Sequence, residues 1–112
     1  MSRATELLPL HAMEFGILLV LLEGDAHAYA IVSELELREP EQHIYPASLY
    51  RRLSDMVDAG LLEERPVPLR ADARRKRYYR ITAFGREVAR EEAHRLQRQV
   101  QGARRLGLLR QT

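Results

Sequence analysis

The pattern of hydrophobic and polar positions first predicts two closely spaced helices. Positions 10–22 are apolar on almost every side, so a helix there is expected to be buried on more than one face. Gly24 ends this helix, the carboxylate of Asp25 is expected to cap the next one, and Pro40 closes that second helix. The apolar positions of the second helix recur at helical spacing and are Ala28, Ile31, Val32 and Leu35.

A third helix is expected to begin at Pro46, because a proline at the first helical position loses no hydrogen bond, and to end at Gly60. Its predicted buried stripe is Leu49, Leu53, Met56 and Val57, and its opposite face carries Ser48, Arg51, Arg52 and Asp55. Positions 61–65 and 76–81 are then predicted to form two strands joined by a hairpin. Alternation in the second strand directs Tyr79 and Ile81 to one face, so that at least one tyrosine is expected in the core.

The rest of the chain predicts one long helix, with Thr82 as its cap. Small and aliphatic residues step by four and three along it, as in a coiled-coil seam, and these are Ala89, Ala93, Leu96, Val100 and Ala103. The predicted order is therefore three helices, a β-hairpin wing and a long helix. This is the order of a mainly α winged helix-turn-helix fold, with a winged-helix DNA-binding domain over residues 1–81 and a C-terminal dimerisation helix over residues 82–112.

Charge is distributed unevenly along the chain, although the formal net charge is only +2. Residues 1–50 hold two cations and eight acids, whereas residues 51–112 hold sixteen cations and eight acids. Within residues 70–80 there are six cations and one acid. Such a local concentration of positive charge is typical of a surface that binds a polyanion.

Three stretches occur in a specific order. ILLVLLEGDAHAYAI (17–31) is followed by PASLYRRLSDMVDAGLLEE (46–64) and by RRKRYYRITAFGRE (74–87). Together they resemble the PadR-like transcriptional regulators. The first stretch is similar to that family's first helix and its His-Gly-Tyr start of helix 2, and the second to its recognition helix and first wing strand. The third is similar to its second wing strand and the Thr-x-x-Gly start of the last helix. Ala28 stands where the family usually has Gly, and Tyr45 stands at a cap position where Ser or Thr is commoner. The resemblance implies a DNA-binding transcriptional regulator, most often a repressor.

The candidate DNA contacts lie on the third helix and the wing. An arginine on the outward face of that helix can bond a guanine edge bidentately or neutralise a phosphate, and Ser48 is expected to bond a phosphate. The basic wing is expected to follow the DNA backbone or to enter a minor groove. The predicted contacts with double-stranded DNA are Tyr45, Ser48, Tyr50, Arg51, Arg52, Arg74, Arg75, Lys76 and Arg77.

The excess of apolar residues on the first helix and on the C-terminal seam predicts a homodimer. The predicted interface residues are Phe15, Leu19, Leu22, Ala89, Ala93, Leu96, Val100 and Ala103. Two-fold symmetry would place two recognition helices about 34 Å apart, facing a palindromic site. The resemblance also implies a small-molecule effector that alters the spacing of the dimer, although the absence of Trp argues against a wide aromatic pore.

Other classes of function find less support. An enzyme is not expected, because no nucleophile has a neighbouring base in the pattern. No metal or cofactor is expected, because the four histidines lack ligand spacing. The longest apolar run, 15–22, is too short to cross a membrane, and the absence of cysteine suits a cytoplasmic protein. The alternative left open is a winged-helix protein-interaction module without DNA binding.

Overall fold

The computed structural model describes residues 3–41, 43–66 and 77–110. In order, the elements are η1 (Arg3–Leu7, a 3-10 helix), α1 (Ala12–Leu22), β1 (Ala26–His27), α2 (Ala28–Arg38), α3 (Pro46–Asp58), β2 (Leu62–Arg65), β3 (Tyr78–Ile81) and α4 (Ala83–Arg105). This order confirms the predicted mainly α winged helix-turn-helix fold. The short elements η1 and β1 were not predicted. The predicted hairpin connection lies outside the described residues.

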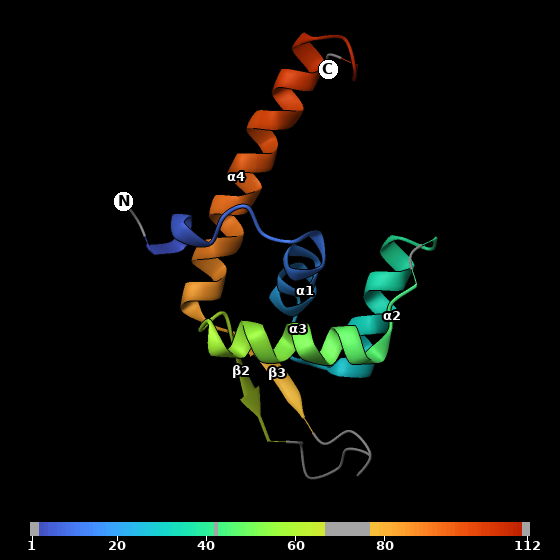
Figure 1. Ribbon diagram of the computed structural model, residues 1–112, viewed down its shortest axis with the longest axis vertical. Coiled ribbons are helices and arrows are strands. Elements are labelled where there is room, and N and C mark those ends of the chain that lie inside the picture. Colours follow the sequence, from blue (N-terminus) through green and yellow to red (C-terminus); the bar gives the residue numbers. More distant parts are fainter. Residues whose placement is uncertain (1–2, 42, 67–76, 111–112) are drawn as a thin grey trace.

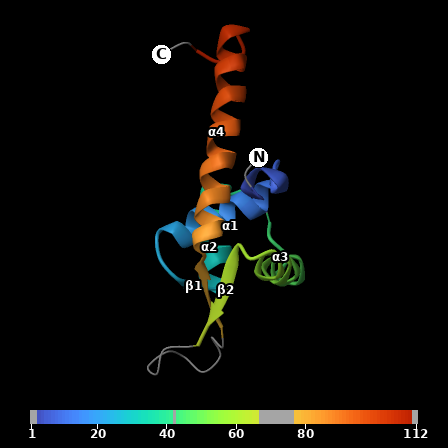
Figure 2. The same cartoon turned by 90° about the vertical axis from the view of Figure 1, so that its left-hand side faces the viewer.

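The helices α1, α2 and α3 form the body of the molecule, and α4 extends far beyond it (Figure 1). Strands β2 and β3 project from the end of the body opposite to the tip of α4 (Figure 2). The sheet is antiparallel with the order β1-β3-β2, and Leu62 lies opposite Ile81 in its register. The central helix is α1, in which Ile17 and Leu18 are fully buried, as its apolar sequence predicts.

The prediction that Asp25 caps α2 is wrong. Ala26 and His27 pair with β3 as strand β1, so the helix cannot begin before Ala28. His27 is the N-cap residue, and its Nδ1 accepts a hydrogen bond from the backbone N–H of Ala30 at 3.1 Å. Asp25 instead pairs with Arg80 on β3, with 3.1 Å between Oδ2 and Nη2.

The start of α4 confirms Thr82 as the cap. Its Oγ1 accepts a hydrogen bond from the Gly85 N–H at 2.9 Å and donates one to the Gly60 carbonyl at 2.6 Å. A Cβ at Gly85 would lie 2.3 Å from the Leu61 carbonyl oxygen, which explains why glycine stands three residues after this threonine. Further along, Val88 is buried in the core of the body. The first turns of α4 therefore pack with the body, and the division of the chain between residues 81 and 82 stays a prediction.

Candidate nucleic-acid interface

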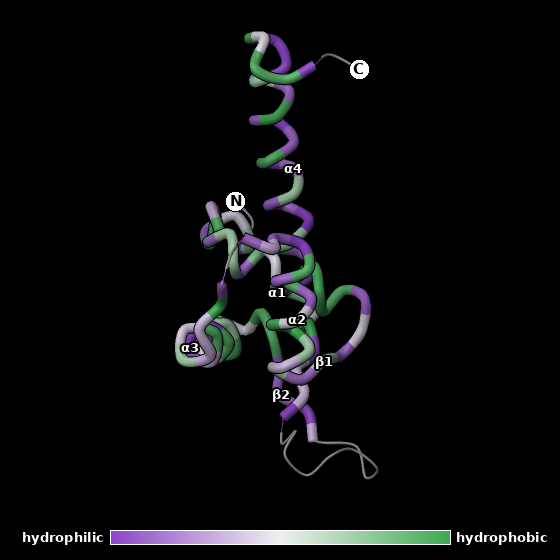
Figure 3. The backbone as a smooth tube through the Cα atoms, turned by 90° about the vertical axis from the view of Figure 1, so that its right-hand side faces the viewer, coloured by the Kyte–Doolittle hydropathy of each residue, from purple (hydrophilic) through white to green (hydrophobic). Residues whose placement is uncertain are grey.

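Helix α3 is strongly amphipathic, as its sequence predicts. Leu49, Leu53 and Met56 are almost completely buried, whereas Val57 is only half-buried. Its hydrophobic positions lie toward the body, with the polar ones on the outside (Figure 3). Pro46 opens the helix, and the preceding Tyr45 makes no side-chain cap hydrogen bond. The helix is thus held by burial of one stripe, which leaves its other face to solvent.

The outward face of α3 gathers hydrogen-bonding groups around a shallow hollow of about 250 Å³, lined by Ser48, Arg51, Arg52 and Asp55. Ser48, Arg51 and Asp55 are exposed. The face therefore offers a hydroxyl, a guanidinium and a carboxylate within two turns of one helix. Such a mixture of donors and acceptors matches the polar edges of base pairs better than it matches an apolar partner.

Arg51 and Arg52 have different surroundings, which the sequence alone did not distinguish. Nη1 of Arg52 lies 3.8 Å from Oε2 of Glu14 on α1, and the Arg52 side chain is only 31% exposed. Glu14 is itself fixed, because its Oε1 accepts the His11 N–H in the capping box that starts α1. Arg52 therefore joins α3 to α1, while Arg51 extends into solvent.

The wing contains both cations and acids. Nη1 of Arg77 lies 3.6 Å from Oε1 of Glu64, and the two side chains are 65% and 44% exposed. Tyr79 and Ile81 are buried, which confirms the predicted alternation. Burial raises the pKa of the Tyr79 hydroxyl, and the nearby Glu64 carboxylate adds to this effect. Three other predicted wing contacts, Arg74, Arg75 and Lys76, lie outside the described residues.

Two predicted aromatic contacts, Tyr45 and Tyr50, are 65% and 56% exposed at the start of α3. Tyr29, in the first turn of α2, is 71% exposed; it belongs to the stretch that resembles the family's His-Gly-Tyr start of helix 2, but it was not among the predicted DNA contacts. The signal that could have identified it is its position among the apolar residues of α2, because it lies off the buried stripe that contains Ala28, Ile31 and Leu35.

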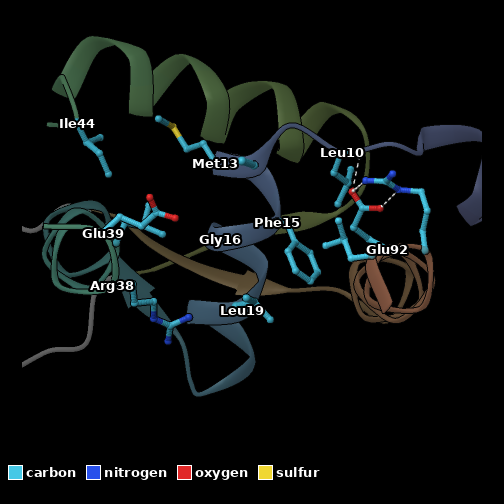
Figure 4. A pocket seen from close by; sticks show the side chains of 13 residues that line it. Leu10, Met13, Phe15, Gly16, Leu19, Arg38, Glu39, Ile44 and Glu92 are labelled. Atoms are coloured by element: carbon cyan, nitrogen blue, oxygen red, sulfur yellow. Dashed lines mark hydrogen bonds and ion pairs between the residues drawn. The ribbon is translucent and has the colours of Figure 1, made fainter. Parts of the chain in front are cut away.

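A separate apolar groove of about 470 Å³ lies between α1, α2 and α4, and Figure 4 shows Phe15 and Leu19 of α1 facing into it. Leu96 of α4 also lines it. Leu22 is 39% exposed, Ala93 and Val100 are exposed and Ala103 is half-buried, and none of these four lines the groove. Ala89 differs from these predicted interface residues, because it is buried in the chain's own core.

The groove also contains a buried charge. Glu92 is 1% exposed, and its carboxylate accepts hydrogen bonds from Nε and Nη2 of Arg95 and from the Leu10 N–H at 2.8 Å. The hydrogen bond from Arg95 is the main cause that lowers the pKa of Glu92 below its ordinary value. The hydrogen bond from the Leu10 N–H also lowers this pKa, whereas burial of the carboxylate raises it. Glu92 thereby ties α4 to the segment that precedes α1.

Two further properties concern the described residues alone. None of their helices is both long and apolar enough to span a bilayer. No group of three or more of their His, Asp and Glu side chains is arranged to hold a metal ion.

The fold and this surface define a winged helix-turn-helix protein whose third helix has an exposed polar face. The sequence matches the Transcriptional regulator PadR-like family over residues 17–91, and the chain belongs to that family of transcription regulators. No curated protein sequence matches the chain significantly.

Solved structures share this fold. H. salinarum RosR is 27% identical, with a TM-score of 0.68 over 80% of this chain and 76% of that one. A PadR family transcription regulator from Clostridium difficile is 17% identical, with a TM-score of 0.73 over 86% and 98% of the two chains. Bacillus subtilis PadR, solved in complex with operator DNA, is 22% identical, with a TM-score of 0.62 over 79% of this chain and 48% of that one.

Proposed function

We propose that this protein is a cytoplasmic transcriptional repressor that binds a palindromic operator in double-stranded DNA as a homodimer. The observation that carries the proposal is the outward face of α3, where Ser48 and Arg51 are exposed opposite an almost completely buried stripe. Membership of the PadR-like family and the operator complex of Bacillus subtilis PadR support the same function.

In this mechanism α3 enters the major groove, and the wing follows the adjacent backbone. Arg51 reads a base edge, because its guanidinium can donate two parallel hydrogen bonds to guanine. Ser48 and the wing cations bind phosphates, which supply most of the affinity and none of the sequence choice. Arg52 has a different role, since its ion pair with Glu14 holds α3 against α1. Binding prevents transcription by occupying the operator.

The dimer in this proposal forms through α4 and the groove. Phe15, Leu19 and Leu96 leave apolar area that the body does not cover, and the exposed Val100 extends it along α4. A partner helix that covers this area brings two recognition helices about 34 Å apart, which sets the spacing of the half-sites. Ala89 is left out of this surface because it is already buried.

A small-molecule effector is the remaining part of the proposal. The groove volume of about 470 Å³ falls within the range of small-molecule sites, about 300–1,000 Å³. Because the partner helix covers the same groove in the proposed dimer, a molecule bound there would displace that helix and so change the position of one recognition helix relative to the other.

The experiment that tests the function is selection of bound sequences from a random duplex pool. We expect enrichment of an inverted repeat whose half-sites are about ten base pairs apart, and an affinity that falls steeply with salt. A pool that shows no enrichment, together with salt-insensitive binding, would contradict the proposal. Capture of a protein partner that survives nuclease and high salt would instead favour the alternative of a protein-interaction module.

A further inference from the structure

The wing is joined to the start of α2 through the shortest strand of the sheet. Strand β1 consists of Ala26 and His27, and these two residues pair with β3 where the wing leaves the body (Figure 2). A ladder of two residue pairs is weak on its own. Burial of Tyr79 and Ile81 holds the inner face of β3, which leaves its outer face to be held by other contacts. We call the junction of β1 with β3 the wing root.

Both side chains on the outer face of β3 contact the chain at the start of α2. Nε and Nη2 of Arg80 approach the same oxygen, Oδ2 of Asp25, at 3.2 and 3.1 Å. The ring of Tyr78 meets that of His27 edge-on, with 5.5 Å between the ring centroids. Because His27 is the N-cap residue of α2, the wing root is fixed to the first turn of that helix.

The pair of Arg80 with Asp25 differs from the pair of Arg77 with Glu64. Arg77 and Glu64 both lie in the wing, so their contact cannot fix the wing relative to the body. Asp25 precedes β1 and lies in the body, whereas Arg80 lies in the wing. The Arg80 pair is also the closer one, at 3.1 Å against 3.6 Å. This contact is therefore able to set the angle of the wing.

Arg80 is poorly placed to bind a phosphate itself. Its side chain is 45% exposed, and its guanidinium is already paired with Asp25. The register of the sheet places Glu63 of β2 opposite Arg80, and residues that lie opposite each other share one face of a sheet. Two acids thus offset the charge of this one cation, which favours a role in holding the wing over a direct contact with DNA.

We propose that Asp25 and Arg80 are positioning residues for DNA binding, which hold the wing at the angle that lets it follow the DNA backbone while α3 lies in the major groove. Arg77 lies three residues before Arg80, which is about 10 Å along an extended strand. A tilt of about 10° at the wing root would therefore displace Arg77 by about 2 Å, enough to break a hydrogen bond to a phosphate. Such a role rests on the proposed function, because the angle of the wing matters only if the chain binds DNA.

The test is Asp25→Ala, measured on the selected operator and on an unrelated duplex at several salt concentrations. Loss of an acid alone would strengthen binding, because it lowers the repulsion between protein and phosphates. If Asp25 positions the wing, the same change should instead weaken binding to both duplexes equally, by about 3- to 10-fold, as for the loss of about one hydrogen bond. The log–log salt slope should fall by about one, although no cation has been removed.

The matched control is Glu23→Ala, two residues earlier in the connection between α1 and β1. Glu23 pairs with Arg38 of α2, with 3.0 Å between Oε1 and Nη2, so this variant also removes one acid and one ion pair but leaves the wing root intact. It should bind both duplexes as the wild type does or slightly more tightly. Since exposed ion pairs contribute little to stability, both variants should unfold at nearly the same temperature as the wild type.

A second substitution tests whether the effect of Asp25 passes through the wing. Arg77→Ala should lower the salt slope by about one if Arg77 binds a phosphate. In a chain that already lacks Arg77, Asp25→Ala should weaken binding by a smaller factor than in the wild type, because changes that act on one contact are not additive. Fully additive losses would show that Asp25 acts independently of the wing, which overturns the proposed role.

The sign of the effect decides between the alternatives. Tighter binding by Asp25→Ala would show that Asp25 only repels DNA or withholds Arg80 from a phosphate, and unchanged binding would show that the contact has no role in binding. If Asp25→Ala lowers the unfolding temperature, Asp25→Asn, which keeps the shape of the side chain, should still give a smaller loss of the same sign; its absence overturns the role. A wild-type chain that binds no duplex would overturn the proposed function as well, whereas the other outcomes leave that function standing.

Discussion

The outward face of α3 and the groove between α1, α2 and α4 differ in chemistry, although both adjoin α1. On α3, Ser48 and Arg51 are exposed to water at little cost because they are polar. In the groove, Phe15 and Leu19 present apolar area, and the charges of Glu92 and Arg95 neutralise each other. The first surface therefore suits a polar, charged partner, and the second suits burial by another helix.

The two surfaces are connected through consecutive residues of α1. Glu14 pairs with Arg52 of α3, and its neighbour Phe15 lines the groove. The connection gives a physical route by which the state of the groove can affect α3. Assembly and base recognition therefore depend on different residues, so each can be altered by its own substitutions.

The largest effect is expected from breaking assembly. Leu96→Glu combined with Val100→Glu places two charges on the apolar seam, which should yield monomers and weaken operator binding by at least about 100-fold, because the advantage of linked half-sites is lost. Sedimentation would measure the mass, and fluorescence anisotropy the affinity. The control variant is Gln97→Glu with Gln101→Glu, which introduces two charges at the same spacing but at exposed, polar positions of α4. A dimer that persists in the first variant would place the interface elsewhere.

The next effect concerns the two adjacent arginines of α3. Arg51→Ala should weaken operator binding by about 10- to 100-fold and relax the preference at one base position, as expected for loss of a base contact worth about 1–3 kcal/mol. Arg52→Ala should have a smaller effect on affinity, because Arg52 pairs with Glu14. Titration of both variants on the selected operator measures the difference. An equal or greater loss for Arg52→Ala would mean that Arg52 leaves Glu14 to bind DNA.

Local patterns were sufficient to predict the main elements of this fold. The stripe of α3 and the Thr82 cap depend on neighbours within one or two turns, so periodicity and capping chemistry identified them. Strand β1 has only two residues and exists because they pair with β3, so no periodic signal preceded it. The cap assigned to Asp25 failed for the same reason.

The site was predicted less completely than the fold. The outward face of α3 followed from its helical period, but the difference between Arg51 and Arg52 depends on Glu14, which lies far away in the sequence. The proximity of Glu64 to Arg77 likewise depends on the register of β2 and β3. Contacts of this kind become visible only when the elements are placed in space.

A smaller effect is expected from the buried charge beside the groove. Glu92→Gln should lower the free energy of unfolding by about 1–2 kcal/mol at neutral pH, because a buried, hydrogen-bonded carboxylate is lost. The pKa of Glu92 is lower in the folded state than its ordinary value of 4.5. The contribution of the Glu92 carboxylate to the free energy of unfolding is therefore complete above pH 4.5 and is lost as the pH falls through the pKa of the folded state. Urea unfolding at pH 7 and at stepwise lower pH measures this.

The matched variant for Glu92 is Glu91→Gln, which removes the same charge from the neighbouring, half-buried position of α4. Its unfolding should depend on pH as that of the wild type does. For Glu92→Gln, the difference from the wild type in the free energy of unfolding should shrink as the pH falls. A difference that stays constant with pH would show that the loss is one of packing and not of charge.

The smallest effect is expected at the wing, where an acid accompanies a cation. The pair of Arg77 with Glu64 is exposed, so it contributes little to stability, but a phosphate must displace Glu64 to bind Arg77. Glu64→Gln should therefore strengthen binding to all duplexes by about two- to threefold at low salt, with less effect at high salt, where exposed charges are screened.

The control for the release of Arg77 from Glu64 is Glu63→Gln, which removes the same charge one position earlier in β2. Alternation along the strand points the Glu63 side chain to the other face of the sheet, and the register places Arg80 opposite it. A general effect of net charge would strengthen binding equally in both variants, whereas release of Arg77 acts only in Glu64→Gln. Titrations on the operator and on an unrelated duplex distinguish the two. Equal gains would assign the effect to net charge, and the wing would then contribute to DNA binding without any restraint of Arg77 by Glu64.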